Sequence, residues 1–362
     1  YVSYNDGDNW EPLQFNLPHA PVYWITVQEH FNDLVISTYG RGFWILDDLT
    51  PIQQMNDQVK SANAFLFPVH QAYRFRGITV PYASSDDPVA GQNPPYGADI
   101  NYYLKAAPRE TQIKILDAGG NTVQTVRGTR NVGFNRVWWN LRNENSKEVR
   151  LRTLPLYASD IKLNNEGWRP LPEGGRLTVL MPPGTYTVKL IVDGQEAGSQ
   201  SLKVLKDPNA GTTDADIQAQ TAMLLDLRKD LEAAADIVNQ IENMRAQLTK
   251  LRAEHADLKA AADDFERKLT EIEDGLIQRR YTGQGQDTTR FPAAMIGNMG
   301  YLAGGVAGGD FPPNKQQQEV HAMYKTRLAD LRKRMDAVTG SDLSNFNKML
   351  KDKNISTVIS GP

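Results

Sequence analysis

Residues 33–48 of this chain read Asp-Leu-Val-Ile-Ser-Thr-Tyr-Gly-Arg-Gly-Phe-Trp-Ile-Leu-Asp-Asp. Two apolar runs flank a break that contains Gly40 and Gly42, which is the pattern of two strands joined by a turn. A third run, Tyr-Trp-Ile-Thr-Val-Gln, precedes them at residues 23–28. The sequence therefore predicts β structure here. Because isolated hairpins are only marginally stable in water, we expect residues 1–50 to belong to a larger β assembly.

A second motif lies in residues 1–10, which read Tyr-Val-Ser-Tyr-Asn-Asp-Gly-Asp-Asn-Trp. This pattern predicts a hairpin turn. Asn5 or Asp6 can accept hydrogen bonds from backbone amides two residues on, and Gly7 can adopt a positive φ. Trp10 should fold back under the turn and bury its ring. A calcium site in this turn is the weaker alternative because the spacing of an EF-hand loop is missing, and no metal site is predicted.

These two motifs resemble parts of β-propeller proteins. The first ten residues resemble the Asp-box of sialidase-like and sortilin-like propellers, Ser-x-Asp-x-Gly-x-x-Trp, with Asn5 at the usual Asp position. Residues 33–48 resemble the final blade of bacterial BNR-repeat, sortilin (VPS10)-like proteins that are often labelled glycosyl hydrolases. In these proteins a Thr-His-Gly-Arg-Ser-Phe-Trp-Ile-Leu-Asp-Asp string recurs. The resemblance implies a terminal propeller blade at residues 1–50 with a structural Asp-box formed by Ser3, Asn5, Asp6, Gly7 and Trp10.

A propeller consists of several blades around a channel, whereas this chain contains about one. We expect the remaining blades to lie upstream of this sequence, and the alternative is that another chain supplies them. The resemblance then makes Tyr39, Arg41 and Trp44 candidate binding residues near an axial pocket. The structural alternative, which we favour, is that Arg41 pairs with carbonyl or carboxylate groups and that Trp44 packs between blades.

No catalytic residue is predicted. Neighbouring residues of a strand point to opposite faces, so Asp47 and Asp48 are not expected to line one cleft as a catalytic pair.

Composition excludes further classes of site. The chain has no cysteine, which rules out disulfides, thiolate zinc sites and cysteine nucleophiles. The glycine-rich run at 301–310 lacks the strand-to-helix context of a nucleotide-binding loop, and no cofactor is predicted.

The middle of the chain is predicted to contain a linker and a second β domain. Residues 51–95 contain six prolines and are interpreted as a Pro-rich linker. Residues 96–206 show short alternating strands separated by turns, which predicts an Ig-like β-sandwich similar to FlgD-type and fibronectin-like modules. Trp138 and Trp139 should point to opposite sides of one strand. Residues 142–176 have few apolar alternations and are interpreted as a loop excursion.

Residues 213–352 predict an antiparallel three-helix bundle. No proline occurs between residues 213 and 281, and apolar residues there recur at alternating spacings of three and four. A turn is placed near residues 252–257, because a single rod would be too long for a compact domain. Residues 283–314 are interpreted as a Gly-rich loop. The core of the bundle is expected to hold no polar cluster, and the five histidines show no metal-ligand spacing.

The fold class is therefore multidomain, β followed by α, and charge restricts its partners. Lys and Arg number 40 against 43 Asp and Glu, so the net charge of −3 argues against a nucleic-acid partner. The sequence contains no run of eighteen apolar residues, so no transmembrane segment is predicted. We expect a non-catalytic binding or scaffolding role with protein partners. The resemblance implies an exported, periplasmic or extracellular bacterial protein. It leaves two alternatives, a glycoside hydrolase whose active site lies in blades outside this chain and a sortilin-like peptide receptor, with glycan or peptide as ligand.

Overall fold

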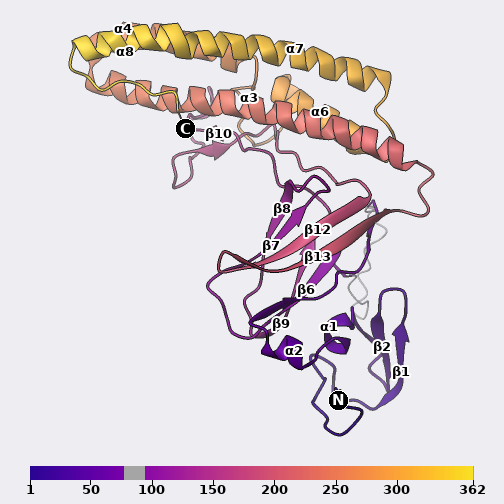
Figure 1. Cartoon of the computed structure of the whole chain (residues 1–362). Coiled ribbons are helices and arrows are strands. Elements are labelled where there is room, and N and C mark those ends of the chain that lie inside the picture. Colours follow the sequence, from indigo (N-terminus) through magenta and orange to yellow (C-terminus); the bar gives the residue numbers. More distant parts are fainter. Residues whose placement is uncertain (77–93, 362) are drawn as a thin grey trace. The chain divides into compact units, whose positions relative to one another are not determined.

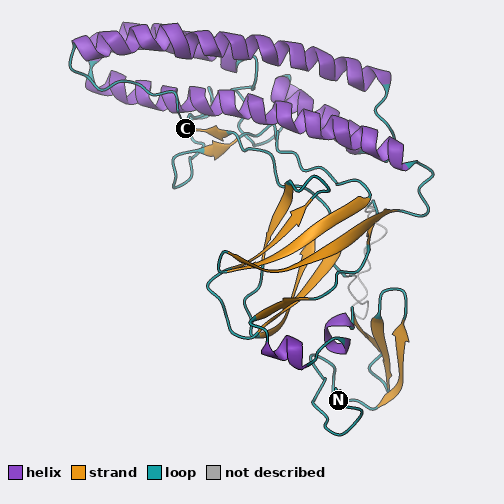
Figure 2. Ribbon diagram, viewed as in Figure 1, coloured by secondary structure: helices purple, strands orange, loops and turns teal. Residues whose placement is uncertain are grey.

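The computed structural model describes residues 1–76 and 94–361. Strands dominate the N-terminal part of the chain and long helices the C-terminal part (Figures 1 and 2), as the sequence predicts. The chain divides into two units, each built from two segments. The β unit consists of Tyr1–Glu144 and Leu180–Gly211. The helical unit consists of Asn145–Val179 and Thr212–Pro362.

The N-terminal segment of the β unit forms a small antiparallel sheet with the order β1 (Val22–Gln28), β2 (Asp33–Thr38), β3 (Phe43–Leu46). The turn between β2 and β3 contains the glycines that the sequence singles out. Gly40 and Gly42 have φ values of 74° and 73°, a conformation that side chains with a Cβ rarely adopt. The side chain of Thr38 donates to the carbonyl oxygen of Gly42 (2.8 Å) and closes the turn.

The segment with the Asp-box pattern forms a tight turn. The side-chain oxygen of Ser3 accepts the backbone N–H of Gly7 (2.8 Å), and Asn5 Oδ1 accepts that of Asn9 (3.0 Å). Gly7 has a φ of 95°, and a Cβ at this position would lie 3.7 Å from the ring of Trp10. That ring is 61% exposed, so the expectation that Trp10 is buried is wrong. Within the described residues no further layer covers it.

The rest of the β unit contains two sheets that share one hydrophobic core. The five-stranded sheet has the order β5 (Ala72–Arg74), β13 (Gln195–Lys206), β12 (Gly184–Val192), β7 (Thr111–Leu116), β8 (Thr122–Arg127). The three-stranded sheet has the order β4 (Ala64–Leu66), β6 (Ala98–Leu104), β9 (Gly133–Trp139). β5 runs parallel to β13, and the other described pairs are antiparallel.

The predicted linker at residues 51–95 is in part regular structure. Its described residues contribute β4 and β5 to the two sheets, together with the short helices α1 (Thr50–Gln53) and α2 (Asp57–Ser61). Pro51 stands at the start of α1, where a missing N–H is tolerated, so this proline does not indicate a linker. The remaining part of the predicted linker, residues 77–93, lies outside the described residues.

The two neighbouring tryptophans point to opposite sides of β9, as predicted. Trp139 is completely buried, and its ring meets that of Tyr186 edge-on at 5.1 Å. Trp138 is half-buried and lines a cavity. Gly97 passes so close to Trp139 that only a residue without a Cβ fits there. A Cβ at Gly97 would lie 1.9 Å from the Trp139 carbonyl oxygen. The φ of Gly97 is 123°, which also favours glycine.

Residues 145–179 are not a loop excursion of the β domain, because the structure groups them with the helices. They contain the short pair β10 (Arg150–Leu151) and β11 (Arg169–Pro170). Four of their apolar side chains belong to the core of the helical unit: Val149, Leu151, Leu171 and Val179. These side chains follow no regular period, so their burial could not be predicted from the sequence.

The helical unit is built around α3, which covers Asp214–Glu254. A capping box between Thr213 and Asp216 begins this helix, and it ends at His255, inside the predicted turn. α3 packs against α4, α6 and α7. The remaining helical segments are the 3₁₀ turn η2 (Ala256–Leu258), α4 (Lys259–Glu273), α5 (Asp287–Arg290), α6 (Met295–Ala307), α7 (Lys315–Ala337), the π-helical η3 (Val338–Asp342) and α8 (Leu343–Asp352).

The predicted Gly-rich loop at 283–314 contains the thirteen-residue helix α6, so its interpretation as a loop is wrong. The buried residues of α6 recur at helical spacing, which the intervening glycines obscure in the sequence. These residues are Met295, Ile296, Met299, Ala303 and Val306. The lack of a side chain at Gly297 has a packing reason, since a Cβ there would lie 2.7 Å from the Glu173 carboxylate. Burial against α3 and α7 stabilises the helix despite its composition.

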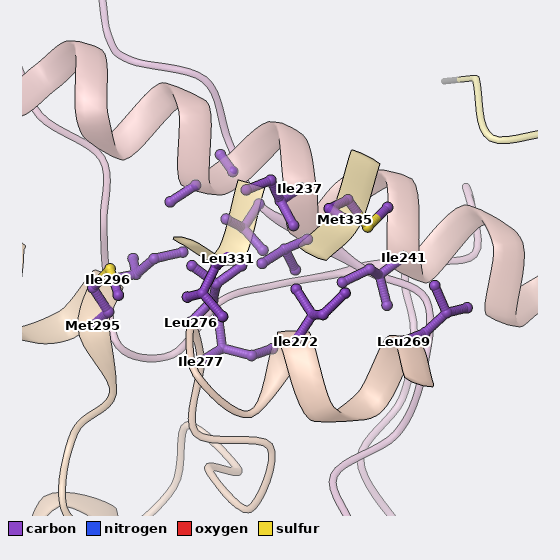
Figure 3. Close-up of a cluster of buried hydrophobic side chains, with 14 of the residues drawn as sticks. Ile237, Ile241, Leu269, Ile272, Leu276, Ile277, Met295, Ile296, Leu331 and Met335 are labelled. Carbon is purple, nitrogen blue, oxygen red and sulfur yellow. The ribbon is translucent and has the colours of Figure 1, made fainter. Parts of the chain in front are cut away.

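Apolar side chains from four helices meet in the core of this unit (Figure 3). The figure labels residues of α3, α4, α6 and α7 that point toward one another: Ile237 and Ile241, Leu269 and Ile272, Met295 and Ile296, and Leu331 and Met335. Leu276 and Ile277, which follow α4, complete the labelled cluster. The apolar residues whose regular spacing predicts these helices are thus the residues that are buried in the core.

A buried charge network crosses the same core, contrary to the expectation that it holds no polar cluster. Arg245 contacts the carboxylates of Glu242 and Glu273, with an Nη2 to Oε2 distance of 2.7 Å to Glu273. The side chains of these three residues are each at most 2% exposed. Arg279 lies 3.2 Å from Glu273 on another side. Through Arg245, this network links Glu242 on α3 to Glu273 on α4.

We expect Gly97→Ala to destabilise the β unit by at least about 3 kcal/mol, because the new methyl group meets backbone atoms at an unfavourable φ. Gly120→Ala is the matched control, since Gly120 also has a positive φ of 79° but has open space around it. It should cost about 1 kcal/mol. Urea unfolding followed by tryptophan fluorescence measures both, because five of the six tryptophans belong to the β unit. Equal costs for the two variants would contradict the close approach.

We expect the stability of the helical unit to depend on pH through Glu273. Burial raises the pKa of Glu273 to about 7, although the charge of Arg245 opposes this. The fold therefore favours the protonated form. The resulting stabilisation is complete below pH 4.5 and is lost as pH rises through 7. Relative to Glu273→Gln, the wild type should lose up to about 3 kcal/mol between pH 4.5 and 8, measured by urea unfolding and circular dichroism at 222 nm.

The control for this experiment is Glu271→Gln, a change at a half-exposed position of the same helix. Its unfolding free energy should follow that of the wild type across the whole pH range. Parallel pH profiles for the wild type and Glu273→Gln would show that Glu273 stays ionised in the folded state.

Candidate functional site

A cavity of about 290 Å³ lies in the β unit, where the end of β3 approaches β5, β6 and β9. Its walls combine two kinds of side chain. The titratable ones are Asp33, Asp47, Asp48, His70 and Asp99, and the aromatic ones are Phe31, Tyr73, Phe75, Tyr96 and Trp138. Apolar walls with a few convergent polar groups are typical of ligand sites.

Asp48 is the centre of the polar part of this cavity and is only 5% exposed. One carboxylate oxygen, Oδ1, accepts the backbone N–H of Thr50 (3.0 Å). The other, Oδ2, accepts the side-chain amide of Asn101 on β6 (2.6 Å). The backbone N–H of Asp48 donates to Asp33 Oδ1 (2.9 Å). Burial opposes ionisation of Asp48, but hydrogen bonds from His70 and Thr50 hold its pKa below the ordinary value.

Asp47 and Asp48 both line the cavity, so the expectation that they cannot share a cleft is wrong. β3 ends at Leu46, and strand alternation therefore does not extend to these two residues. Asp48 has a φ of 50°, a left-handed conformation that Asp tolerates better than most residues. Both residues therefore line the same cavity.

His70 contacts two groups through a single ring nitrogen. Its Nε2 lies 3.1 Å from Asp48 Oδ1 and 2.5 Å from Thr50 Oγ1. The hydrogen bond with Asp48 raises the pKa of His70 above its ordinary value. A histidine that activates a hydroxyl nucleophile uses one nitrogen for the hydroxyl and the other for the carboxylate. The geometry here is different, so it does not make Thr50 a nucleophile of that type.

Arg136 and Asn101 hold the remaining polar groups in place. Arg136 donates through Nε to Asn101 Oδ1 (2.6 Å) and through Nη2 to the backbone carbonyl oxygen of Asp47 (2.7 Å). Asn101 donates in turn to Asp99 Oδ2 (3.0 Å). Burial, followed by the charge of Asp48, raises the pKa of Asp99. Burial and the charge of Asp33 likewise raise the pKa of Asp47.

The predicted binding residues Tyr39 and Arg41 lie in the turn between β2 and β3, and Trp44 lies on β3; none of the three is among the residues that line this cavity. Tyr39 is exposed and meets the ring of Tyr23 edge-on at 5.7 Å. The indole N–H of Trp44 donates to the backbone carbonyl oxygen of Arg41 (3.0 Å), and the guanidinium of Arg41 is exposed. The structure thus brings Trp44 to Arg41, whereas the described ring contact of Tyr39 is with Tyr23.

The predicted Asp-box residues form the separate turn described above. Asp6 occupies a left-handed conformation in it, with a φ of 53°, and is exposed to solvent. The side chain of Ser3 donates to Asn5 Oδ1 (3.1 Å), which fixes the Asn5 side chain for its contact with the backbone. These contacts are local, so they give the motif a structural role.

Sequence reasoning missed His70, Asp99, Asn101 and Arg136. Asp99 and Asn101 on β6 meet Arg136 through the pairing of β6 with β9, and His70 comes from the segment between β4 and β5. Asn101 faces Arg136 in the β6–β9 register. A polar pair at inward positions of two predicted strands is the only signal the sequence offers for them.

A second polar cluster lies in the helical unit, where ligand atoms of Asp226, Asp230 and His321 are within 4.8 Å of one another. His321 Nε2 is 2.7 Å from Asp230 Oδ2. Lys325 Nζ is 2.7 Å from Asp226 Oδ1 and 3.3 Å from Asp230 Oδ2, so an ammonium group already balances these carboxylates. The cluster could hold a metal ion only if Lys325 moved away. Its members come from α3 and α7, which conceals their proximity in the sequence.

Comparison with known proteins adds no identification: no family model, no curated protein and no solved structure matches this chain. Among residues 1–76 and 94–361, no helix combines the length and the apolar character needed to cross a bilayer.

We expect Asp48→Asn to lower the pKa of His70, because the variant keeps the shape of the side chain but removes the negative charge. Asn also tolerates the left-handed conformation at position 48. NMR titration of the imidazole protons measures this pKa. Asp8→Asn, at an exposed position of the same unit, should leave the titration of His70 unchanged. The same pKa for His70 in wild type and Asp48→Asn would contradict the described contact.

Proposed function

We propose that this chain is a non-catalytic association module, in which the sheet β1–β2–β3 packs as a propeller blade between further β-sheets of a larger exported assembly. One observation carries the proposal. All seven residues of β1 are exposed, although five of them are apolar or aromatic. Soluble proteins rarely leave contiguous apolar surface of this kind uncovered unless it is an interaction site.

One face of this sheet carries three large exposed side chains. The strand register places Trp24 beside Ser37 and Ser37 beside Phe43. Trp24 and Phe43 are 71% and 80% exposed, and Ile45 follows on the same face. Cross-strand neighbours on one face of an antiparallel sheet form a continuous surface. This face therefore offers an aromatic patch to a partner.

The opposite face is apolar as well. Ile25 and Val27 on β1 point to it, and Ile25 is 61% exposed. Ile36 and Trp44 lie beside Ile25 in the register and are half-buried. A sheet that exposes apolar groups on both faces needs a partner on each, which is the situation of a blade between two neighbouring blades. This two-sided exposure favours further β-sheets as the occupants.

The other parts of the chain would then act as the framework of the assembly. In this proposal the two sheets around Trp139 correspond to an Ig-like or fibronectin-like sandwich, and the long helices correspond to an antiparallel three-helix bundle. Both have extensive hydrophobic cores of their own. The net charge of −3 supports protein rather than nucleic-acid partners.

Photo-crosslinking in the cells that produce the protein tests this proposal. We expect p-benzoylphenylalanine in place of Phe43 to give cross-links to alternating, strand-like sequence segments, and Trp24→Glu should abolish them because it places a charge in the interface. The control position is Val132, which is exposed elsewhere in the β unit. Mass spectrometry of the adducts shows whether the partner segment belongs to the same polypeptide or to another chain. Equal cross-linking at positions 43 and 132, on a protein that sediments as a monomer, would overturn the proposal.

A further inference from the structure

We propose that the cavity between Asp47, Asp99 and Trp138 is a binding site for an organic cation, a protonated amine, amidinium or guanidinium group. This inference is independent of the proposed association through β1–β2–β3. It concerns the polar and aromatic walls of the 290 Å³ cavity described above, which the association module does not use.

Among the residues that the structure describes, negative groups outnumber positive ones around the cavity. Asp33, Asp47, Asp48 and Asp99 line it, and the described cationic groups that contact this cluster are Arg136 and His70. Arg136 is already engaged by Asn101 and by the backbone of Asp47, and its Nε is 3.9 Å from Asp99. His70 is directed to Asp48. The charge that remains uncompensated disfavours an anionic ligand.

Asp47 is the carboxylate best placed to receive a ligand. Within the part of the chain that the structure describes, its carboxylate makes no hydrogen bond and no ion pair, and it is half-buried against the cavity. Asp48, in contrast, has both oxygens occupied by Thr50, His70 and Asn101. A carboxylate held in a cleft without a counter-charge gains from pairing with a cation.

The aromatic walls favour the same class of ligand. Tyr73 stacks on Phe75 with ring centroids 5.5 Å apart, and Phe31 meets Tyr73 edge-on at 6.4 Å. Trp138 contributes a further wall from β9. Aromatic faces attract cations and also pack against the apolar part of an organic one. A neutral polyhydroxyl compound would use the rings but leave the carboxylates unpaired. The combination therefore selects an organic cation.

Proton linkage gives a second signature of this site. The pKa values of Asp47 and Asp99 are raised by burial and by neighbouring carboxylates. A cation between them favours the ionised forms, so binding should release protons at acidic pH and weaken as the pH falls. Among the described residues, the neighbouring carboxylates of Asp33 and Asp48 strengthen this effect, whereas the permanent charge of Arg136 and the charge of protonated His70 oppose it.

Isothermal titration calorimetry of the full chain with benzamidine tests the proposal, with benzamide as the uncharged analogue of the same size. We expect benzamidine to bind at least tenfold more tightly at pH 7, and its affinity to fall with added salt. Titrations at pH 5 in buffers of different ionisation enthalpy should show proton release. Equal affinity for the two compounds would mean that the cavity accepts aromatic molecules without regard to charge, and would overturn the proposal.

Asp47→Asn locates the binding site. It should weaken benzamidine binding about tenfold, because it removes the charge and keeps the shape of the side chain. The matched control is Asp8→Asn, which removes a charge from an exposed position of the same unit and should leave the affinity unchanged. If Asp47→Asn unfolds the protein, Asp99→Asn provides the second test. Unchanged affinity in a folded Asp47 or Asp99 variant would place the cation elsewhere and overturn the assignment.

The cationic group could come from a free small molecule or from a side chain of a peptide. A blocked Gly-Arg-Gly peptide and its citrulline counterpart distinguish these sources, since the two peptides differ only in the charge of the middle side chain. Tighter binding of the arginine peptide than of benzamidine assigns the site to a basic side chain. Binding of benzamidine alone assigns it to free cations. Both results support the proposal.

Discussion

The carboxylate of Asp48 is the interaction on which the arrangement of the β unit depends. It receives hydrogen bonds from Thr50 at the start of α1, from Asn101 on β6 and from His70 before β5. Two segments that are distant in sequence, β6 and the residues before β5, are thereby tied to the residues that follow β3. A buried charge of this kind is stable only when its hydrogen-bonding capacity is satisfied. The cavity beside it exists because these groups keep the strand ends at fixed positions.

Local patterns predicted the elements of the fold well, whereas contacts between distant segments could not be predicted. The glycine break at residues 40–42 correctly predicts a turn, and the apolar residues at spacings of three and four correctly predict α3. Turns and helices depend on near neighbours in the sequence. α6 was missed because its glycines obscure a stripe that only packing against α3 reveals. The cavity was missed because its polar groups come from separate segments: Asp48 follows β3, His70 precedes β5, and Asp99 lies on β6.

In the helical unit, a buried polar residue holds in place a segment whose sequence has no regular apolar period. Glu242 on α3 accepts the backbone N–H groups of Arg152 and Thr153, and it also contacts Arg245. The carboxylate thus satisfies backbone donors in a segment that forms only the two-residue strands β10 and β11. An irregular segment can be held firmly in a core when its free amides find such a partner, even though its sequence has no pattern.

The order of the segments along the chain has a consequence for biosynthesis. The chain leaves the β unit after residue 144, contributes residues 145–179 to the helical unit, returns to the β unit at residue 180, and leaves it again after residue 211. During translation, the five-stranded sheet lacks its central strand β12 and the neighbouring β13, which joins β12 to β5, until both have emerged from the ribosome. For the same reason, no single proteolytic cut can liberate either unit whole, because each needs polypeptide from both sides of the other.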